Sequence, residues 1–307
     1  MNSYEEYTAL VGTDSRMVAV VTRPARGERR PEATGVVLLG AGLVHHIGPN
    51  RLMVNLARRL AGCGYACVRF DHCGIGDSYP QDDGRPFEVV ACDETKEVMD
   101  WFSHAEGVRS FVLLGICSGA ETALRATLLD RRIEGGVMVN GGGQGAGSDW
   151  DVFEYVRGEA RNYLKQSFFS FDSWYRALTG RIQYRRLFGI LMAHMRNRLF
   201  PSPQVAEAAS GVARDVEAIV ERGARLLWVQ SEGDFSRDYF ETMFGKDAQR
   251  LSDSGCVQIE VLSFVDHILT GRHAQQRFLD TVEQWLVCRA SAANPHPQGN
   301  ARRVVSP

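Results

Sequence analysis

The segment from residue 110 to residue 121 constrains the fold more than any other part of the chain. An apolar run, Phe111 to Leu114, leads into the pattern Gly-x-Cys-x-Gly and then into a sequence typical of a helix. A sharp turn from strand to helix has no room for side chains two residues before and after its apex. Gly115 and Gly119 meet that requirement around Cys117. The segment therefore predicts a nucleophile elbow with Cys117 at its apex.

The position of Cys117 also suits its chemistry. It would stand at the N-terminus of the following helix, where unpaired N–H groups and the helix dipole favour a thiolate and a developing oxyanion. Two other interpretations stay open. The two glycines can serve close packing of the strand and helix alone. Ser118 is an alternative nucleophile, although one position past the apex its side chain would turn into the helix while its N–H faces the oxyanion.

The rest of the chain alternates apolar, β-rich runs with amphipathic stretches. This rhythm predicts an α/β fold with a mostly parallel, eight-stranded sheet covered by helices on both faces. The first two strands, joined by a Gly-Thr-Asp turn, should form an antiparallel pair at one edge. We expect strands at 7–11, 17–22, 35–39, 66–70, 111–114, 137–140, 225–230 and 257–262, and helices at 50–62, 87–102, 118–129, 237–249 and 273–289.

The rhythm stops after Asn140 and resumes near Arg225. The intervening sequence is helical in character and dense in large aromatic residues, which is typical of a lid inserted into a core domain. The last residues are rich in Ala, Asn, Pro and Arg, a composition that favours disorder. We therefore expect a core formed by residues 1–148 and 224–289, a helical lid insertion at 149–223, and a disordered tail at 290–307.

An acid and a histidine follow later strands in the order that an elbow nucleophile requires. Asp234 comes after the run 226–230, and His267 comes after the run 257–262 and ahead of the final helix. Asp234 would fix the tautomer of His267, and His267 would take the proton of the thiol. Asp266 and Asp238 are alternative acids, although Asp266 is poorly placed to reach the ring of its neighbour.

The turn after the first parallel strand should complete the oxyanion hole. We expect the N–H of Ser118 to be one donor and the N–H of Gly42 or Leu43 to be the other. His45 and His46 lie next along the chain, at the mouth of the expected site. They would orient the oxyanion turn or a substrate carbonyl, or they would simply hydrogen-bond the loop backbone.

With these residues assembled, the chain resembles the α/β-hydrolase superfamily from about Tyr7 to Leu286. Residues 71–78, DHCGIGDS, resemble the superfamily's D-x-R-G-x-G-x-S turn, with Cys73 in place of arginine. Residues 40–51 resemble the G-A-G-x-x-H-x-I-G-P-N-R turn of a subset with a cysteine nucleophile. That subset includes hydrolases associated with the exosortase system and thioesterases or acyltransferases encoded with polyketide and peptide assembly lines. Within this turn, Asn50 also suits a purely structural role as a helix N-cap.

A cysteine nucleophile favours thioester chemistry, because it exchanges one thioester for another at nearly equal free energy. We therefore expect a thioesterase or an acyltransferase or cyclase that forms an acyl-Cys117 intermediate. The donor would be an acyl thioester of coenzyme A or of a carrier protein, and the acceptor water, an amine or an alcohol. A hydrolase of small activated esters or lactones shares the same residues, and a non-catalytic binding protein on this fold is a third possibility.

The expected lid suggests an apolar acyl chain. Trp150, Phe153, Trp174 and Tyr175 are candidate contacts, although many aromatic residues there must pack the lid on the core. Nine basic and four acidic residues lie between positions 150 and 200. Their surplus suits a pantetheine phosphate or an acidic carrier protein, or forms a solvated helix face. The arginines are Arg157, Arg161, Arg176, Arg181, Arg185, Arg186, Arg196 and Arg198.

Composition excludes other classes of partner. A net charge of −2 gives no basic field that would hold a nucleic acid or an anionic membrane. The seven cysteines contain no CxxC pair, which argues against a disulfide framework and a zinc site. No signal peptide and no apolar run of about 18 residues is found, so we expect a soluble, cytoplasmic protein without metal or cofactor. The oligomeric state is left open.

Overall fold

A computed structural model describes residues 4–25, 34–80, 84–141, 203–232 and 248–293, together with Asp234, Phe240 and Phe244. These residues contain one eight-stranded sheet with the order β1-β2-β4-β3-β5-β6-β7-β8. β2 pairs antiparallel with β1 and β4, and every other pair is parallel, as the sequence predicts. The strands are β1 (Tyr4–Val11), β2 (Met17–Pro24), β3 (Thr34–Leu39), β4 (Ala66–Phe70), β5 (Ser110–Ile116), β6 (Ile133–Val139), β7 (Arg225–Ser231) and β8 (Val257–Leu262).

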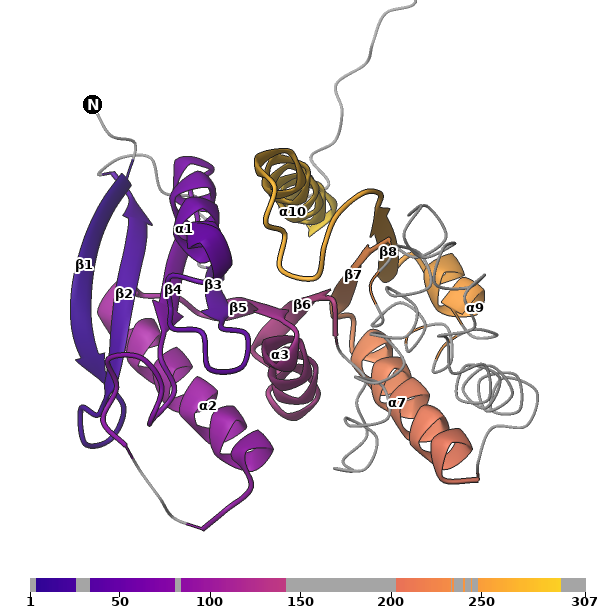
Figure 1. The fold of residues 1–307 in the computed structure, drawn as a ribbon, viewed down its shortest axis with the longest axis horizontal. Helices are drawn as coiled ribbons and strands as arrows, with labels where there is room; N and C mark the ends of the chain where they lie inside the picture. Colours follow the sequence, from indigo (N-terminus) through magenta and orange to yellow (C-terminus); the bar gives the residue numbers. More distant parts are fainter. Residues whose placement is uncertain are drawn as a thin grey trace, which may run out of the picture.

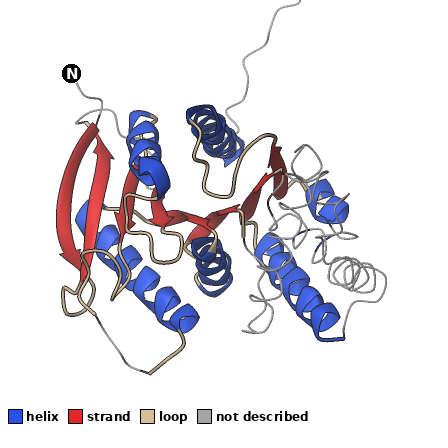
Figure 2. Ribbon diagram, in the orientation of Figure 1, coloured by secondary structure: helices blue, strands red, loops and turns tan. Residues whose placement is uncertain are grey.

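Helices cover both faces of the sheet. They are α1 (Leu52–Gly62), preceded by the 3₁₀ turn η1 (Pro49–Arg51), α2 (Phe87–Glu106), α3 (Ser118–Leu129), α7 (Pro203–Glu221), α9 (Ala248–Asp253) and α10 (Arg272–Ala293). α1 and α10 lie together on one face, and α2, α3 and α7 lie on the other (Figure 1, Figure 2). The prediction of a parallel sheet enclosed between two helical layers is confirmed.

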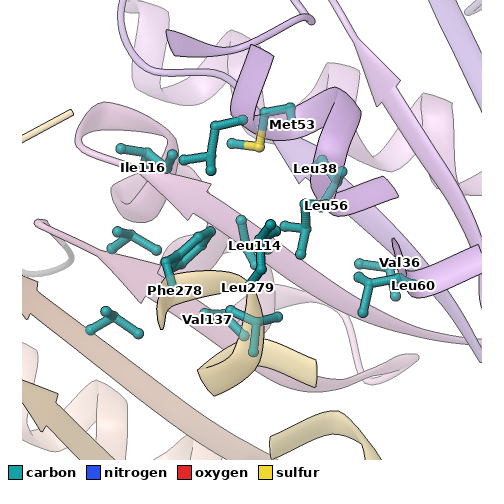
Figure 3. Close-up of a cluster of buried hydrophobic side chains, with 14 of the residues drawn as sticks. Val36, Leu38, Met53, Leu56, Leu60, Leu114, Ile116, Val137, Phe278 and Leu279 are labelled. Atoms are coloured by element: carbon teal, nitrogen blue, oxygen red, sulfur yellow. The ribbon is translucent and has the colours of Figure 1, made fainter. Parts of the chain in front are cut away.

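The core follows the two-residue period of the buried strands. Val36 and Leu38 of β3 point toward α1 and α10, whereas Val37 and Leu39 pack on the α2 side. Figure 3 shows the first of these clusters, in which side chains of β3, β5 and β6 meet those of α1 and α10. β5 is buried along almost its whole length. The turn that follows β5 is therefore held by packing on both faces of the sheet.

The start of α1 differs from the sequence prediction. Asn50 and Arg51 have φ angles of 51° and 61°, and neither the N-cap of η1 nor that of α1 has a side-chain hydrogen bond. The expectation that Asn50 caps the helix is therefore wrong. Backbone bonds take the place of the cap: Met53 N–H donates to the carbonyl of Ile47 at 3.2 Å. The path of the preceding loop, and not the capping preference of asparagine, sets the backbone conformation here.

Some of the described residues fall within the expected insertion and the expected tail. α7 falls within residues 149–223, and its Val216 and Ile219 are buried in a cluster with β7. α10 continues to Ala293, so residues 290–293 are helical rather than disordered. The rest of the expected lid and tail lies outside the described residues. In the described part of the chain, no helix is both long and apolar enough to cross a membrane.

Candidate active site

The turn after β5 has the geometry of an elbow. Cys117 has φ 55° and ψ −119°, a left-handed conformation that residues other than glycine rarely adopt. A Cβ on Gly115 would lie 1.9 Å from the carbonyl oxygen of Gly119, and a Cβ on Gly119 would lie 2.3 Å from that of Gly40. The Cys117 N–H donates to the carbonyl of Val139 at 2.8 Å, which fixes the apex against β6. Only glycine fits on either side of this apex.

The histidine and the acid expected from the sequence lie together. Nδ1 of His267 is 2.7 Å from Oδ2 of Asp234, whose side chain is 4% exposed. The side chain of Cys117 is close enough to His267 to help raise its pKa. Of the alternative acids, Asp266 accepts hydrogen bonds from Thr270 and so closes its own turn, while Asp238 lies outside the described residues.

The partners of His267 change its protonation. Burial disfavours the imidazolium, but the hydrogen bonds to Asp234 and Cys117 and the charges of both outweigh it and raise the pKa of His267 to about 10. At neutral pH His267 is therefore favoured in its imidazolium form, beside Asp234 and Cys117.

Replacing Asp234 with asparagine is expected to lower the pKa of His267, because the negative charge is lost and an amide oxygen is a weaker acceptor than a carboxylate. The carboxylate's contribution to stability is fully present below the ordinary histidine value of 6.5 and disappears as the pH rises through about 10. The stability gap between wild type and variant should therefore narrow from about pH 6.5 to pH 10. Histidine NMR titration and urea unfolding check both statements. An unchanged His267 pKa would contradict them.

A buried asparagine holds the histidine loop, and the sequence analysis did not find its role. Asn140 follows β6 and is 2% exposed. Its Nδ2 donates to the carbonyl of His267 at 2.7 Å and to Oγ of Ser231 at 2.9 Å, and its Oδ1 accepts the Ser231 N–H at 2.8 Å. Oγ of Ser231 in turn donates to the carbonyl of Asp266 at 3.0 Å. These bonds fasten the backbone of His267 to the ends of β6 and β7.

The Asn140→Ala variant should loosen the histidine and slow the alkylation of Cys117 by iodoacetamide at neutral pH by about tenfold, the effect of losing one or two buried hydrogen bonds. Cys117 would lose the steady histidine partner that assists its reaction with the alkylating agent. The rate is measured by mass spectrometry of the Cys117 peptide. Asn55→Ala, at an exposed asparagine on α1, is the control. Equal rates in all three proteins would remove Asn140 from this role.

The turn after β3 contacts the elbow through Ser118. The N–H of Gly42 donates to Oγ of Ser118 at 2.7 Å. Ser118 begins α3, so its own N–H has no acceptor within the helix. The Ser118 hydroxyl thus faces the oxyanion turn and not the helix, which corrects the expectation. Leu43, the other candidate in this turn, has a side chain that is 88% exposed.

The similarities between this chain and known proteins concern its fold. No protein-family model and no curated protein matches the chain. Among solved structures, proline iminopeptidase from Mycobacterium smegmatis is 16% identical with a TM-score of 0.57, and the match covers 94% of this chain and 100% of that one. The chain has the α/β-hydrolase fold. Brefeldin A esterase, a bacterial homologue of human hormone-sensitive lipase, is 19% identical with a TM-score of 0.55 over 95% and 79% of the two chains. Epoxide hydrolase from Vigna radiata is 13% identical with a TM-score of 0.54 over 93% and 99%.

In this α/β-hydrolase fold, His46 ties the oxyanion turn to the end of β4. Its N–H and its Nδ1 lie 2.5 and 2.7 Å from the two carboxylate oxygens of Asp71, and Asp77 N–H donates to the same carboxylate at 3.2 Å. These bonds outweigh burial and hold the pKa of Asp71 below its usual value. His46, Asp71 and Asp77 offer ligand atoms within 4.8 Å of one another, but the oxygens of Asp71 already have protein partners. We interpret the group as a clamp for the loop.

Of the remaining residues expected to contact substrate, His45 is among the described residues and the others are not. His45 is exposed and packs edge-on against His46 at 5.4 Å between ring centroids. Trp150, Phe153, Trp174, Tyr175 and the eight arginines of the expected lid lie outside the described residues. The loops that carry Gly42 and His267 also present exposed apolar side chains. They are Leu43, Val44, Phe264 and Ile268.

Proposed function

We propose that the protein is an acyl-transfer enzyme that acts on thioesters through a covalent acyl-Cys117 intermediate. The observation that carries this proposal is the pairing of His267 with Asp234 next to a cysteine held in a left-handed conformation at the elbow. A strained backbone at such a position is typical of functional sites. Oγ of Ser118 accepts the N–H of Gly42, and within the described residues no hydrogen bond joins it to a histidine.

The proposed reaction uses each of these groups in turn. The Cys117 thiolate attacks the thioester carbonyl, and the oxyanion is held by the N–H groups of Ser118 and Gly42 once the Ser118 hydroxyl rotates away. The carbon–sulfur bond to the leaving thiol breaks, and His267 protonates that sulfur. In the second half, His267 takes a proton from water, an amine or an alcohol as this acceptor attacks the acyl-cysteine, and Cys117 leaves as thiolate. Asp234 keeps the imidazole in place throughout.

The chemistry of cysteine supports a thioester over an oxygen ester. Exchange between two thioesters is close to balanced in free energy, so the acyl group stays activated on Cys117 for transfer. The exposed apolar side chains of Leu43, Val44, Phe264 and Ile268, on the loops that carry Gly42 and His267, suit an acyl group that is long and largely apolar. The donor class we propose is an acyl thioester of pantetheine, carried by coenzyme A or by a carrier protein.

The test compares matched pairs of substrates with the same acyl group, one an N-acetylcysteamine thioester and the other a phenyl ester. We expect kcat/KM to favour the thioester, and His267→Ala to lose activity on both. A marked preference for the phenyl ester would replace this proposal with the small-ester or lactone hydrolase. No turnover and no acylation of Cys117 by any donor would favour a non-catalytic binding protein.

A further inference from the structure

The turn that follows β3 is exposed where it carries Gly42. Residues 42–45 are all exposed, whereas Ala41 before them is buried in the core. Apart from its chain neighbours, a Cβ on Gly42 would meet no described atom within 4 Å. Packing therefore does not fix this residue. Its position depends on the hydrogen bonds that it and the next residues make.

One of these hydrogen bonds must break during the proposed reaction. The Gly42 N–H donates to Oγ of Ser118 at 2.7 Å, and the substrate oxygen has to replace that hydroxyl. The Val44 N–H donates to the carbonyl of Ala41 at 2.9 Å, but this bond lies within the turn itself. When the Ser118 hydroxyl leaves, the exposed turn therefore needs an anchor at its far end.

His46 and Asp71 supply an anchor at that end. The Asp71 side chain, which is 1% exposed, accepts the His46 N–H at 2.5 Å and lies 2.7 Å from Nδ1 of the same residue. His46 is thus bound through both its backbone and its side chain. A Cβ on Gly76 would overlap the Asp71 carboxylate and lie 2.7 Å from the Cβ of His45. The two loops are therefore packed closely where the anchor joins them.

The segment that carries Asp71 is itself fixed on two sides. The Asp71 N–H donates to the carbonyl of Val18 on β2 at 3.0 Å. On the other side, Oε2 of Glu94 on α2 lies 2.7 Å from Nδ1 of His72 and accepts the Cys73 N–H at 3.3 Å. The anchor is tied in this way to both the sheet and a helix. A change at His46 would therefore displace the exposed turn rather than Asp71.

We propose that His46 and Asp71 are positioning residues of the oxyanion hole. They keep the N–H of Gly42 directed at the elbow after the Ser118 hydroxyl has given way to the substrate oxygen. The proposal rests on the acyl-transfer function and on the oxyanion role of Gly42 proposed above. Neither positioning residue touches the substrate. They act on the rate because a donor stabilises developing charge best when it is held in place beforehand.

The test compares two reactions of Cys117 that differ in their need for an oxyanion hole. Acylation by the hexanoyl thioester of N-acetylcysteamine passes through an oxyanion, whereas alkylation by iodoacetamide displaces iodide at a saturated carbon and forms none. Intact-protein mass spectrometry measures both rates. His46→Ala should slow acylation about tenfold, the effect of one lost buried hydrogen bond, and should change alkylation by less than about twofold.

Three further variants make this comparison specific. His46→Asn, whose side-chain amide can still donate to Asp71, should recover most of the acylation rate. Asp71→Ala should slow acylation at least as much as His46→Ala, and the double variant should be little slower, because the two residues act through one contact. His104→Ala is the matched control, since Nδ1 of His104 also lies beside an oxygen, the carbonyl of Asp100 on α2. It should leave both rates unchanged.

Two results would overturn the role of the anchor. Equal slowing of acylation and alkylation in His46→Ala would mean that the residue only supports the fold. An unchanged acylation rate in that variant would mean that the turn holds the Gly42 N–H without it.

Two further reagents separate this proposal from the thioester function. If phenyl hexanoate acylates Cys117 and the thioester does not, the thioester function fails, and the same comparison with the phenyl ester tests the anchor. If neither ester acylates it, hexanal takes their place: its carbonyl carbon bonds the sulfur, and the thiol proton passes to the oxygen. Hexanal should protect Cys117 from iodoacetamide with a Kd about tenfold higher in His46→Ala than in wild type. Equal Kd values, or no protection of wild type, contradict the proposal.

Discussion

Replacing Cys117 with alanine is expected to lower kcat/KM for acyl transfer by about 10⁴ or more, because the atom that bonds the acyl group is removed. His267→Ala should cost a similar factor. The double variant should be little worse than either alone, since the two groups act as one unit. Steady-state kinetics with the acyl thioester of N-acetylcysteamine that wild type turns over best gives kcat/KM for all three variants.

The matched control for this prediction is another cysteine. Cys288 is exposed on α10, and Cys288→Ala should keep full activity. Residual activity of Cys117→Ala within tenfold of wild type would transfer the role to a different residue. In that case the alternative nucleophile, Ser118, would be the next to replace.

Replacing Gly115 with alanine is expected to destabilise the fold by about 3 kcal/mol or more, at or beyond the upper end of overpacking in a core. The new Cβ would lie 1.9 Å from the backbone oxygen of Gly119, and neither β5 nor α3 can retreat from its buried neighbours. The elbow would have to move, so the alkylation of Cys117 should slow as well. Urea unfolding measures the loss as a fall in the midpoint.

Gly211→Ala is the control for this change. Gly211 lies within α7, and a Cβ there would meet nothing within 4 Å. Alanine is the better helix former, so this variant should be as stable as wild type or slightly more so. If Gly115→Ala unfolded at the same urea concentration as Gly211→Ala, the elbow would be far less tightly packed than the structure indicates.

The fold could be predicted because its signals are local. The alternation of strands and helices, and the glycines two residues before and after Cys117, are each visible within a short window of sequence. The carboxyl ends of parallel strands lie at one edge of a sheet, so the order of the motifs sufficed to place Asp234 and His267 near the cysteine. The pairing of these two residues at 2.7 Å agrees with that expectation.

The supporting groups could not be found in this way, because their partners are distant in sequence. Asn140 bonds a loop 127 positions away, and Glu94 reaches His72 across 22 positions. Neither residue belongs to a motif with a fixed spacing. Their side chains become informative only when the sheet brings the strand ends together. Asn50 failed as a predicted cap for the same reason, since the path of its loop and not its own preference sets its backbone.

The most direct measurement of the central claim is the mass of the intact protein after brief incubation with acyl thioesters of N-acetylcysteamine that differ in their acyl group. Wild type should gain the mass of the acyl group, and peptide mapping should locate it on Cys117. Cys117→Ala should gain nothing, and His267→Ala should accumulate less. An adduct on Ser118 or another residue, or no adduct from any donor, would contradict an acyl-Cys117 intermediate.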